Sequence, residues 1–322
     1  MPKSKLMAWA KAMMLRGQYN WAARLFAARV AADERPVALC WNGLNSSRRV
    51  FMDAARDAGA QTLFFELAPL PGRITVDPMG VNFANALPRK AGPYLDWAAR
   101  NPGQLGGWRQ ITTQIAQRQP LVATTVPKQN RPEGERFIFV PLQLEGDSQL
   151  SLFGGPCRSV AATVQLICQA AANLPAGWHI RLKEHPNALT SIAPVLAGFA
   201  AAPVYLDNET DTFSQVRAAD LVLTVNSSVG LEAMLFERPV ATIGQCFWSF
   251  AGVAHQAPTA EALAQLCAAP DQASFDPASR DAFLSFLTAQ YYPTLTLRDD
   301  QTFEMTAAER AKITARLNGR LI

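Results

Sequence analysis

The second half of the chain alternates strictly between short apolar segments and helical segments, and this alternation constrains the fold most. The apolar segments end at polar or turn-forming residues, and the segments between them have the period of helices. The expected strands are, in chain order, FIFVPLQ (137–143), WHIRLKEHP, PVYLDN, LVLTVNSS and PVATIG. Strands that alternate with helices pair in parallel, so the pattern predicts a doubly wound sheet.

A second α/β unit is expected earlier in the chain. PVALCWNG (36–43) and QTLFFELA (61–68) have the composition of strands, and SSRRVFMDAARDAGA between them that of a helix. Residues 69–90 are rich in proline, asparagine and aspartate, so a long functional loop is expected there. We therefore predict two Rossmann-like domains that face a ligand cleft. The predicted segments are a basic helix at 1–34, α/β domains at 35–145 and 146–285, and a helical tail at 286–322.

Composition excludes several classes of protein. The chain has 322 residues, 49% of them hydrophobic and 17% charged, which is typical of a globular protein with a large core. Its five cysteines are scattered without a CxxC pair, which favours reduced thiols in the cytoplasm, and neither they nor the three histidines cluster at metal-ligand spacing. The net charge of +4 and the lack of a long apolar run predict neither nucleic-acid binding nor a membrane span. No signal peptide is recognised.

Residues 5–30 are expected to be helical, with Gly17 and Asn20 as candidate break points. The segment combines a broad apolar face, which includes Trp9 and Trp21, with basic residues only, because no aspartate or glutamate precedes Asp33. Two roles fit equally well. The helix either lies on an anionic membrane surface, as in a peripheral membrane protein, or packs on the domain core.

The segment Val222–Met234, VLTVNSSVGLEAM, predicts an anion site. A helix that begins at Ser227 or Ser228 directly after a strand presents free N–H groups and the positive end of its dipole. Gly230 is expected to let the backbone approach a ligand closely, and Glu232 to reach the hydroxyls of a ribose. The alternative is that Ser227 only caps the helix and that Glu232 lies on the surface.

A second motif, RLKEHP, ends another strand of the same predicted sheet. Pro186 keeps the residue before it extended, so His185 is aimed out of the sheet. Together with Lys183, His185 is expected at the edge where such sheets bind ligands, where an imidazole can donate to a leaving phosphate oxygen. The alternative is a histidine that only caps the strand. Since both motifs suit a phosphate at one sheet edge, they predict a nucleotide-sugar site.

These motifs and two further stretches resemble the bacterial capsule polysaccharide synthesis proteins, in particular the β-Kdo (3-deoxy-D-manno-octulosonic acid) transferases of the Kps type. The resembling stretches are FFELAPLPGRITVDPMGVN, FVPLQLEGDSQL, RLKEHPN and LVLTVNSSVGLEAMLFERPV. They follow the family's order over most of residues 35–250. The resemblance is greatest to the branch that adds the first Kdo to a lipid acceptor.

The resemblance implies a GT-B-like fold in which residues 35–145 form the acceptor side and residues 146–285 bind the donor, CMP-Kdo. The residues that would hold CMP are Lys183, His185, Pro186, Asn226, Ser227, Ser228 and Glu232. Asp147 would be the carboxylate beside the anomeric carbon in a retaining reaction. Glu145 is the alternative, because the chain has Glu145-Gly146-Asp147 where some relatives have paired acids. No cofactor or metal is expected, since CMP has a single phosphate and the chain lacks a DxD-type acidic motif.

The acceptor side offers a second set of candidates. They are Glu66, Asp77 and Asn82 from the resembling loop, and Arg48 and Arg73, which could pair with the carboxylate of Kdo. Arg49 fits as well, and an ordinary surface arginine is the alternative for each. The expected partners are CMP-Kdo, a lipid or glycan acceptor and a membrane surface.

Other functions stay open from the sequence. A CDP-glycerol-type polyol-phosphate transferase and a sialyl-like CMP-sugar transferase also use the histidine–proline motif. A non-hydrolysing sugar epimerase has the same fold class but a different acidic pattern. A non-catalytic component of capsule assembly or export would retain only the fold. The presence of His185, Asp147 and Glu232 favours an enzyme.

Overall fold

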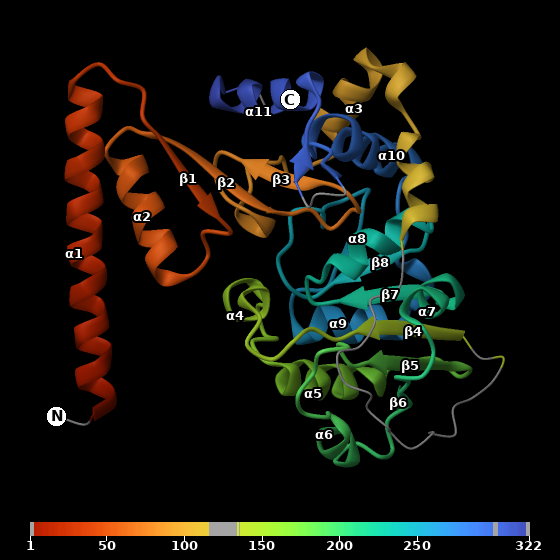
Figure 1. The fold of residues 1–322 in the computed structure, drawn as a ribbon. Coiled ribbons are helices and arrows are strands. Elements are labelled where there is room, and N and C mark those ends of the chain that lie inside the picture. Colours follow the sequence, from red (N-terminus) through yellow and green to blue (C-terminus); the bar gives the residue numbers. More distant parts are fainter. Residues whose placement is uncertain (1–2, 116–133, 135, 299–301, 320–322) are drawn as a thin grey trace. The chain divides into compact units, whose positions relative to one another are not determined.

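The computed structural model describes residues 3–115, 134, 136–298 and 302–319, and it divides into two compact units (Figure 1). The first unit comprises Met1–Ala68, Gly72–Leu87 and Gln290–Ile322. The second comprises Pro69–Pro71 and Pro88–Ala289. The segment from Gln290 onward therefore belongs to the first unit, whereas the sequence predicts a separate helical tail at 286–322.

The first unit contains a three-stranded sheet in the order β1-β2-β3. β1 (Val37–Trp41) and β2 (Gln61–Leu67) are parallel and are connected by α2 (Ser46–Asp57), as predicted. β3 (Ile74–Asp77) pairs antiparallel with β2, and η1 (Asn82–Ala84) follows it. β3 lies inside the segment that was predicted to be a loop. Its β-branched residues form a buried strand because the prolines at 69, 71 and 78 flank it without interrupting it.

The first helix, α1 (Lys3–Ala31), is continuous, so neither predicted break point interrupts it. It runs beside α2, where Phe26 is buried and meets Phe51 edge-on with ring centroids 5.5 Å apart (Figure 1). Gln18 and Tyr19 add hydrogen bonds to Ser47 and Asp57 of α2. The packing role that was considered for this helix is therefore present on one of its sides.

The C-terminal segment of the first unit is only partly helical. β10 (Thr296–Leu297) and β11 (Phe303–Glu304) form a two-stranded antiparallel sheet, and α11 (Ala307–Leu317) follows. Ile313 and Leu317 of α11 pack with Leu63 of β2. The predicted helical tail thus ends in a helix that covers the sheet of the first unit.

The second unit contains a six-stranded parallel sheet in the order β6-β5-β4-β7-β8-β9, which confirms the predicted doubly wound arrangement. Its strands are β4 (Arg136–Pro141), β5 (Trp178–Lys183), β6 (Val204–Leu206), β7 (Leu221–Thr224), β8 (Val240–Thr242) and β9 (His255–Gln256). β4 lies between β5 and β7, whereas the predicted boundary at 145 and 146 assigned it to the preceding domain. Its residues from 137 to 141 are buried, as expected for a strand covered on both faces.

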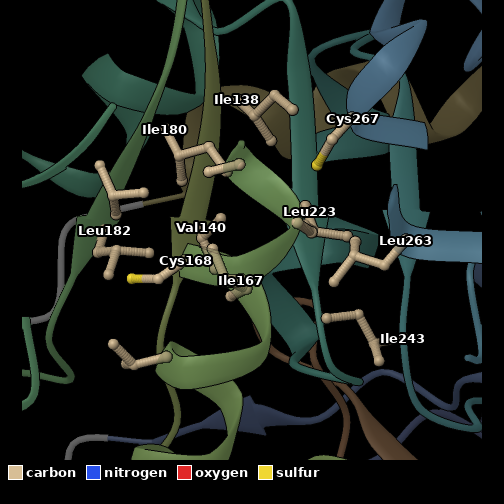
Figure 2. Packing of buried hydrophobic residues seen from close by; sticks show 14 of the residues in the cluster. Ile138, Val140, Ile167, Cys168, Ile180, Leu182, Leu223, Ile243, Leu263 and Cys267 are labelled. Carbon is tan, nitrogen blue, oxygen red and sulfur yellow. The ribbon is translucent and has the colours of Figure 1, made fainter. Parts of the chain in front are cut away.

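Helices α5 (Val160–Ala171) and α9 (Ala260–Ala268) pack on this sheet, and α7 (Thr212–Ala218) and α8 (Ser228–Leu235) contact its strands. The remaining helices between residues 88 and 291 are α3 (Gly92–Arg100), η2 (Pro102–Gln104), η3 (Gly107–Gln114), α4 (Ser148–Phe153), α6 (Ala193–Ala197), η4 (Pro270–Gln272), α10 (Pro277–Phe286) and η5 (Leu287–Tyr291). Figure 2 shows Ile167 and Cys168 of α5 and Leu263 of α9 packed on Val140 and Leu223 of the sheet. All five cysteines are free and buried, as expected for core thiols.

Within the described residues, no helix combines the length and the apolar character that a membrane span requires. The same part of the chain contains no group of three or more His, Cys, Asp or Glu side chains that could hold a metal ion.

Candidate functional site

The C-terminal edge of the six-stranded sheet gathers the loops that carry the predicted donor-binding residues. Residues 142–147 follow β4, residues 184–192 follow β5, and residues 225–228 follow β7. The chain proceeds from β4 to β5 and β6 on one side and returns with β7 on the other side of β4. β4 and β7 therefore flank the topological switch point, which is where open α/β sheets bind their ligands.

A pair of side-chain amides connects the loops at this switch point. Gln143 Nε2 donates to Asn226 Oδ1 at 3.0 Å, and the Asn226 backbone N–H donates to Gln143 Oε1 at 3.4 Å. Asn226 is buried and also donates through Nδ2 to the carbonyl oxygen of Gln149 at 2.9 Å. Asn226, a predicted nucleotide ligand, thus holds the β4 and β7 loops together. Gln143 was not among the predicted site residues, although a polar residue at the end of a buried apolar strand is a usable signal.

Asp147 lies next to this amide pair. It is the N-cap of α4: its Oδ1 accepts from the Gln149 backbone N–H at 2.8 Å, while Oδ2 accepts from Gln143 Nε2 at 3.3 Å. Asp147 therefore has a structural role as a helix cap. A half-buried carboxylate that is held at both oxygens has a defined position at the switch point.

Glu145, the competing carboxylate, is used differently. It is exposed, and its Oε2 accepts from the Val160 backbone N–H at 2.9 Å, at the first residue of α5. Gly146 lies between the two acids with φ at +81°, a left-handed conformation that lets the chain turn sharply. Asp147 therefore accepts its backbone hydrogen bond from the start of α4, and Glu145 accepts its own from the start of α5. Of these two acids, only Asp147 contacts the amide pair.

Lys183 is turned into the unit rather than presented at the sheet edge. It is 8% exposed, and its Nζ donates to the carbonyl oxygens of Asn208 and Thr210 at 2.7 and 2.8 Å. Burial lowers the pKa of Lys183, and the charge of Asp211 opposes this effect. In this structure the ammonium group therefore orders the loop after β6, although the sequence predicted a contact with the nucleotide.

The loop after β5 is closed by Glu184, which was not predicted. Its Oε1 accepts from Ser191 Oγ and from the Ile192 N–H, and its Oε2 accepts from Asn208 Nδ2 at 2.7 Å. A carboxylate that accepts several hydrogen bonds fixes the two ends of the loop that it connects. Because Glu184 directly precedes His185, these bonds also fix the backbone on which His185 lies.

His185 is half-buried at the start of this loop. Its Nδ1 accepts from the Asn187 backbone N–H at 3.1 Å, so the proton of the neutral ring is assigned to Nε2. Pro186 restricts the backbone between His185 and Asn187. The neutral imidazole therefore has its donor group at Nε2, as a phosphate-binding role requires.

A cavity of about 410 Å³ adjoins His185 in the second unit. Its walls include Leu142 and Leu144 from the β4 loop, Val160 from α5, and Ile192 at the end of the β5 loop. Glu145, Glu184 and His185 supply polar groups. A mostly apolar cavity of this volume with a few polar groups is typical of small-molecule sites.

The third loop begins α8. Ser227 is its N-cap, and its Oγ accepts from the Val229 N–H at 3.3 Å, so the capping alternative applies to this serine too. Within the described residues, the Ser228 hydroxyl has no hydrogen-bond partner in the protein. The helix start keeps its positive dipole end at the sheet edge. Glu232 is buried, so the alternative that it lies on the surface is wrong.

Gly230 has a packing role that differs from the predicted one. A Cβ atom at this position would lie 2.4 Å from Trp248 Cη2 and 2.9 Å from Thr224 Cγ2. Trp248 is 2% exposed, so its indole fills the space that a side chain at Gly230 would need. The close approach to α8 is therefore made by a tryptophan of the core and not by a ligand.

We expect Gly230→Ala to lower the melting temperature of the second unit. Overpacking in a core typically costs about 1–3 kcal/mol, which exceeds the helix propensity of roughly 1 kcal/mol that alanine adds. Thermal unfolding followed by circular dichroism measures the change. Gly17→Ala in α1 is the matched control, because a Cβ there meets nothing within 4 Å. A Gly230→Ala protein as stable as the wild type would contradict the packing role.

The acceptor-side candidates lie in the first unit, and three polar groups meet at the C-terminal end of β1. Asn42 Nδ2 donates to Glu66 Oε2 at 2.5 Å, and Arg48 Nη1 donates to the Trp41 carbonyl oxygen at 3.1 Å. Asn42 has φ at +66° and was not predicted as a site residue, although an Asn-Gly pair directly after a strand is a recognisable signal. Glu66 and Arg48 are thus both placed at this strand end.

Asp77 is fully buried and accepts hydrogen bonds from the backbone of Met79, Gly80 and Ala86 and from the Tyr291 hydroxyl. Burial raises its pKa against the lowering effect of these bonds. Its carboxylate orders residues 79–86 and has no exposed surface for a substrate. The predicted acceptor role of Asp77 is therefore replaced by a structural one.

The other acceptor-side candidates are more accessible. Asn82 is half-buried and opens η1 with φ at +54°. Arg73 is half-buried; burial lowers its pKa, and the charge of Glu309 opposes this. Arg49 is exposed and pairs with Asp53 at 3.8 Å. None of these features singles out one arginine for a sugar carboxylate.

Comparison with known proteins gives a family and a fold. Residues 104–292, more than half of the chain, match the family described as capsule polysaccharide biosynthesis protein. Protein FixF of Sinorhizobium fredii (strain NBRC 101917 / NGR234) is 27% identical over 228 residues, which cover 70% of this chain and 50% of FixF. The chain thus spans about half the length of this curated relative.

Two solved structures of Thermosulfurimonas dismutans KpsC are similar in fold. The β-Kdo 2,7 transferase has a TM-score of 0.50 at 14% identity and covers 91% of this chain and 88% of its own. The β-Kdo 2,4 transferase has a TM-score of 0.51 at 18% identity, with 85% and 86% covered. These likenesses confirm the predicted GT-B-like α/β fold class.

Proposed function

Because the chain belongs to the capsule polysaccharide biosynthesis protein family, we propose that it is a retaining glycosyltransferase that moves Kdo from CMP-Kdo to a lipid or glycolipid acceptor. The observation that carries this proposal is the arrangement at the switch point of the six-stranded sheet. There, Asp147, His185 and the start of α8 follow three neighbouring strands. For transfer from a nucleotide sugar, a carboxylate can act as the nucleophile, and an imidazole donor and a helix N-terminus can stabilise the leaving phosphate.

The spacing of the strands suits a nucleotide sugar. Neighbouring strands lie about 4.8 Å apart, so the ends of β5 and β7, on either side of β4, are separated by roughly 10 Å. The phosphate of CMP would lie between His185 Nε2 and the start of α8, where Ser228 adds a hydroxyl. Neither group needs a divalent metal to bind a single phosphate.

The sugar would lie over the β4 loop, where Asp147 can reach its anomeric carbon. Attack by Asp147 Oδ2 forms a bond to this carbon as the bond to the CMP phosphate oxygen breaks, and His185 Nε2–H stabilises the charge on that oxygen. The acceptor hydroxyl then attacks the same carbon and gives its proton to solvent, while the bond between this carbon and Asp147 Oδ2 breaks and the carboxylate is released. Two inversions give net retention. Gln143 and the cap of α4 hold the carboxylate in place for both steps.

A ligand-dependent melt tests the nucleotide assignment. We expect CMP at a hundred times its dissociation constant to stabilise the protein by about 2.7 kcal/mol and to raise its melting temperature, because CMP binds only the folded chain. UDP at the same concentration should have no effect. Release of CMP from CMP-Kdo in the presence of a lipid acceptor, followed by chromatography, then tests the reaction. An equal shift with UDP, or none with CMP, would remove the proposed donor.

A further inference from the structure

The side of α1 that faces away from α2 carries large apolar side chains exposed to solvent. Ala22 and Phe26 are buried toward α2, whereas Trp9 is 57% and Trp21 61% exposed. At 100° per residue, the exposed large residues other than Val30 fall within an arc of roughly 160° on the opposite side of the helix. This exposed apolar face consists of Leu6, Met7, Trp9, Met13, Met14, Trp21 and Leu25. One side of the helix therefore belongs to the core, and the other has no partner within the described residues.

The charges of α1 all have one sign. The helix contains no aspartate or glutamate. Its described cations are Lys5, Lys11, Arg16, Arg24 and Arg29. On the helical wheel, Lys5 and Arg16 border one edge of the exposed apolar face, Lys11 and Arg29 border the other, and Arg24 lies within the face itself. Arg29 pairs with Glu34 at 3.0 Å, while the other four have no ion pair in the described part of the chain.

We propose that the exposed apolar face of α1 docks on an anionic lipid surface. Its methionines and leucines would enter the boundary between head groups and acyl chains, and Trp9 and Trp21 would lie at the head-group level. The flanking lysines and arginines would meet lipid phosphates. Helix α1 would thus lie in the plane of the surface without spanning it.

Charge decides between a lipid surface and a second copy of the chain. Two α1 helices packed through this face would bring their bordering cations together, with no acidic residue on either helix to pair with them. Repulsion between these cations disfavours self-association, whereas an anionic surface neutralises them. The proposal rests only on α1 and is independent of the proposed transferase activity.

The test uses point substitutions on the full chain, because deletion of α1 would also remove Ala22 and Phe26 from the core. Flotation with phosphatidylcholine vesicles, with and without phosphatidylglycerol, measures binding. We expect wild-type protein to float only with phosphatidylglycerol and to be released by high salt. Trp9→Ser/Trp21→Ser should lose this binding. Lys11→Gln/Arg24→Gln should weaken it roughly tenfold or more, at about 1 kcal/mol for each cation near the surface.

The controls separate a surface effect from misfolding. Phe303→Ser changes another exposed apolar residue of the first unit and should float like the wild type. Equal melting temperatures, and equal stabilisation by CMP if CMP binds, show that the α1 variants are folded. Binding that is unchanged in Trp9→Ser/Trp21→Ser, or that is independent of phosphatidylglycerol, would overturn the proposal. So would a wild-type dimer in light scattering that becomes a monomer in this variant, because the face would then bind a second copy.

Discussion

His185→Ala is expected to lower kcat of CMP-Kdo transfer by roughly 10²–10³, which is the typical effect of losing one donor that stabilises developing charge. The Nδ1 atom of His185 is occupied by the Asn187 N–H, so the neutral ring donates through Nε2. Alanine removes this donor while Glu184 still closes the loop through Ser191 and Ile192. The fold of the loop should therefore persist while the leaving phosphate loses its partner.

Initial rates of CMP release, measured beside the melting temperature, distinguish these effects. His255→Ala is the matched control, because this histidine belongs to the same unit but lies on β9 and not in the three loops. It should retain wild-type turnover. A His185→Ala enzyme with near-wild-type kcat would remove the histidine from the mechanism. A raised KM with unchanged kcat would assign it to ground-state binding instead.

The second unit was predictable from the sequence because its strands are buried on both faces. Runs such as residues 137–141 and 221–224 are apolar almost without interruption, and the helices between them are long enough to show their period. β3 was missed because a strand of four residues between prolines resembles a loop. The return of the segment that begins at Gln290 to the first unit has no local signal, since Leu317 packs on a cluster that includes Leu63 and lies in a distant part of the chain.

The candidate site was predictable at the level of motifs but not of contacts. A histidine–proline pair and a serine pair at strand ends are local patterns, so His185 and Ser227 could be found. The pairing of Gln143 with Asn226 joins residues 83 positions apart, and no local pattern encodes it. For Lys183, the local pattern predicts a contact that the structure does not show. Its place in a strand predicted a ligand contact, whereas the structure turns its ammonium group toward the backbone of the β6 loop.

Asp147→Asn is expected to have the largest effect of all, a loss in kcat on the order of 10⁴ or more, comparable to the removal of a catalytic nucleophile or its partner elsewhere. The substitution is well matched to the structure. Asparagine is as good an N-cap as aspartate, so its oxygen can still accept from the Gln149 N–H and keep α4 in place. What disappears is the charge and the nucleophilic second oxygen. Asp276→Asn, which changes the N-cap of α10 in the same way, should leave turnover unchanged.

The adduct itself identifies the nucleophile. Wild-type protein mixed with CMP-Kdo and no acceptor should gain the mass of one sugar, and peptide mapping should locate it on Asp147. Asp147→Asn should form no adduct yet still be stabilised by CMP, because the phosphate site after β5 and β7 is intact. An adduct on Glu145 would mean that Glu145 breaks its hydrogen bond to the start of α5 during the reaction and that Glu145, not Asp147, is the nucleophile.

A product of inverted configuration would exclude the covalent step, because a single displacement inverts the anomeric carbon. Asp147, held by Gln143 and by its own helix, would then act on the acceptor hydroxyl as a general base, and Asp147→Asn would remain slow without any adduct in the wild type.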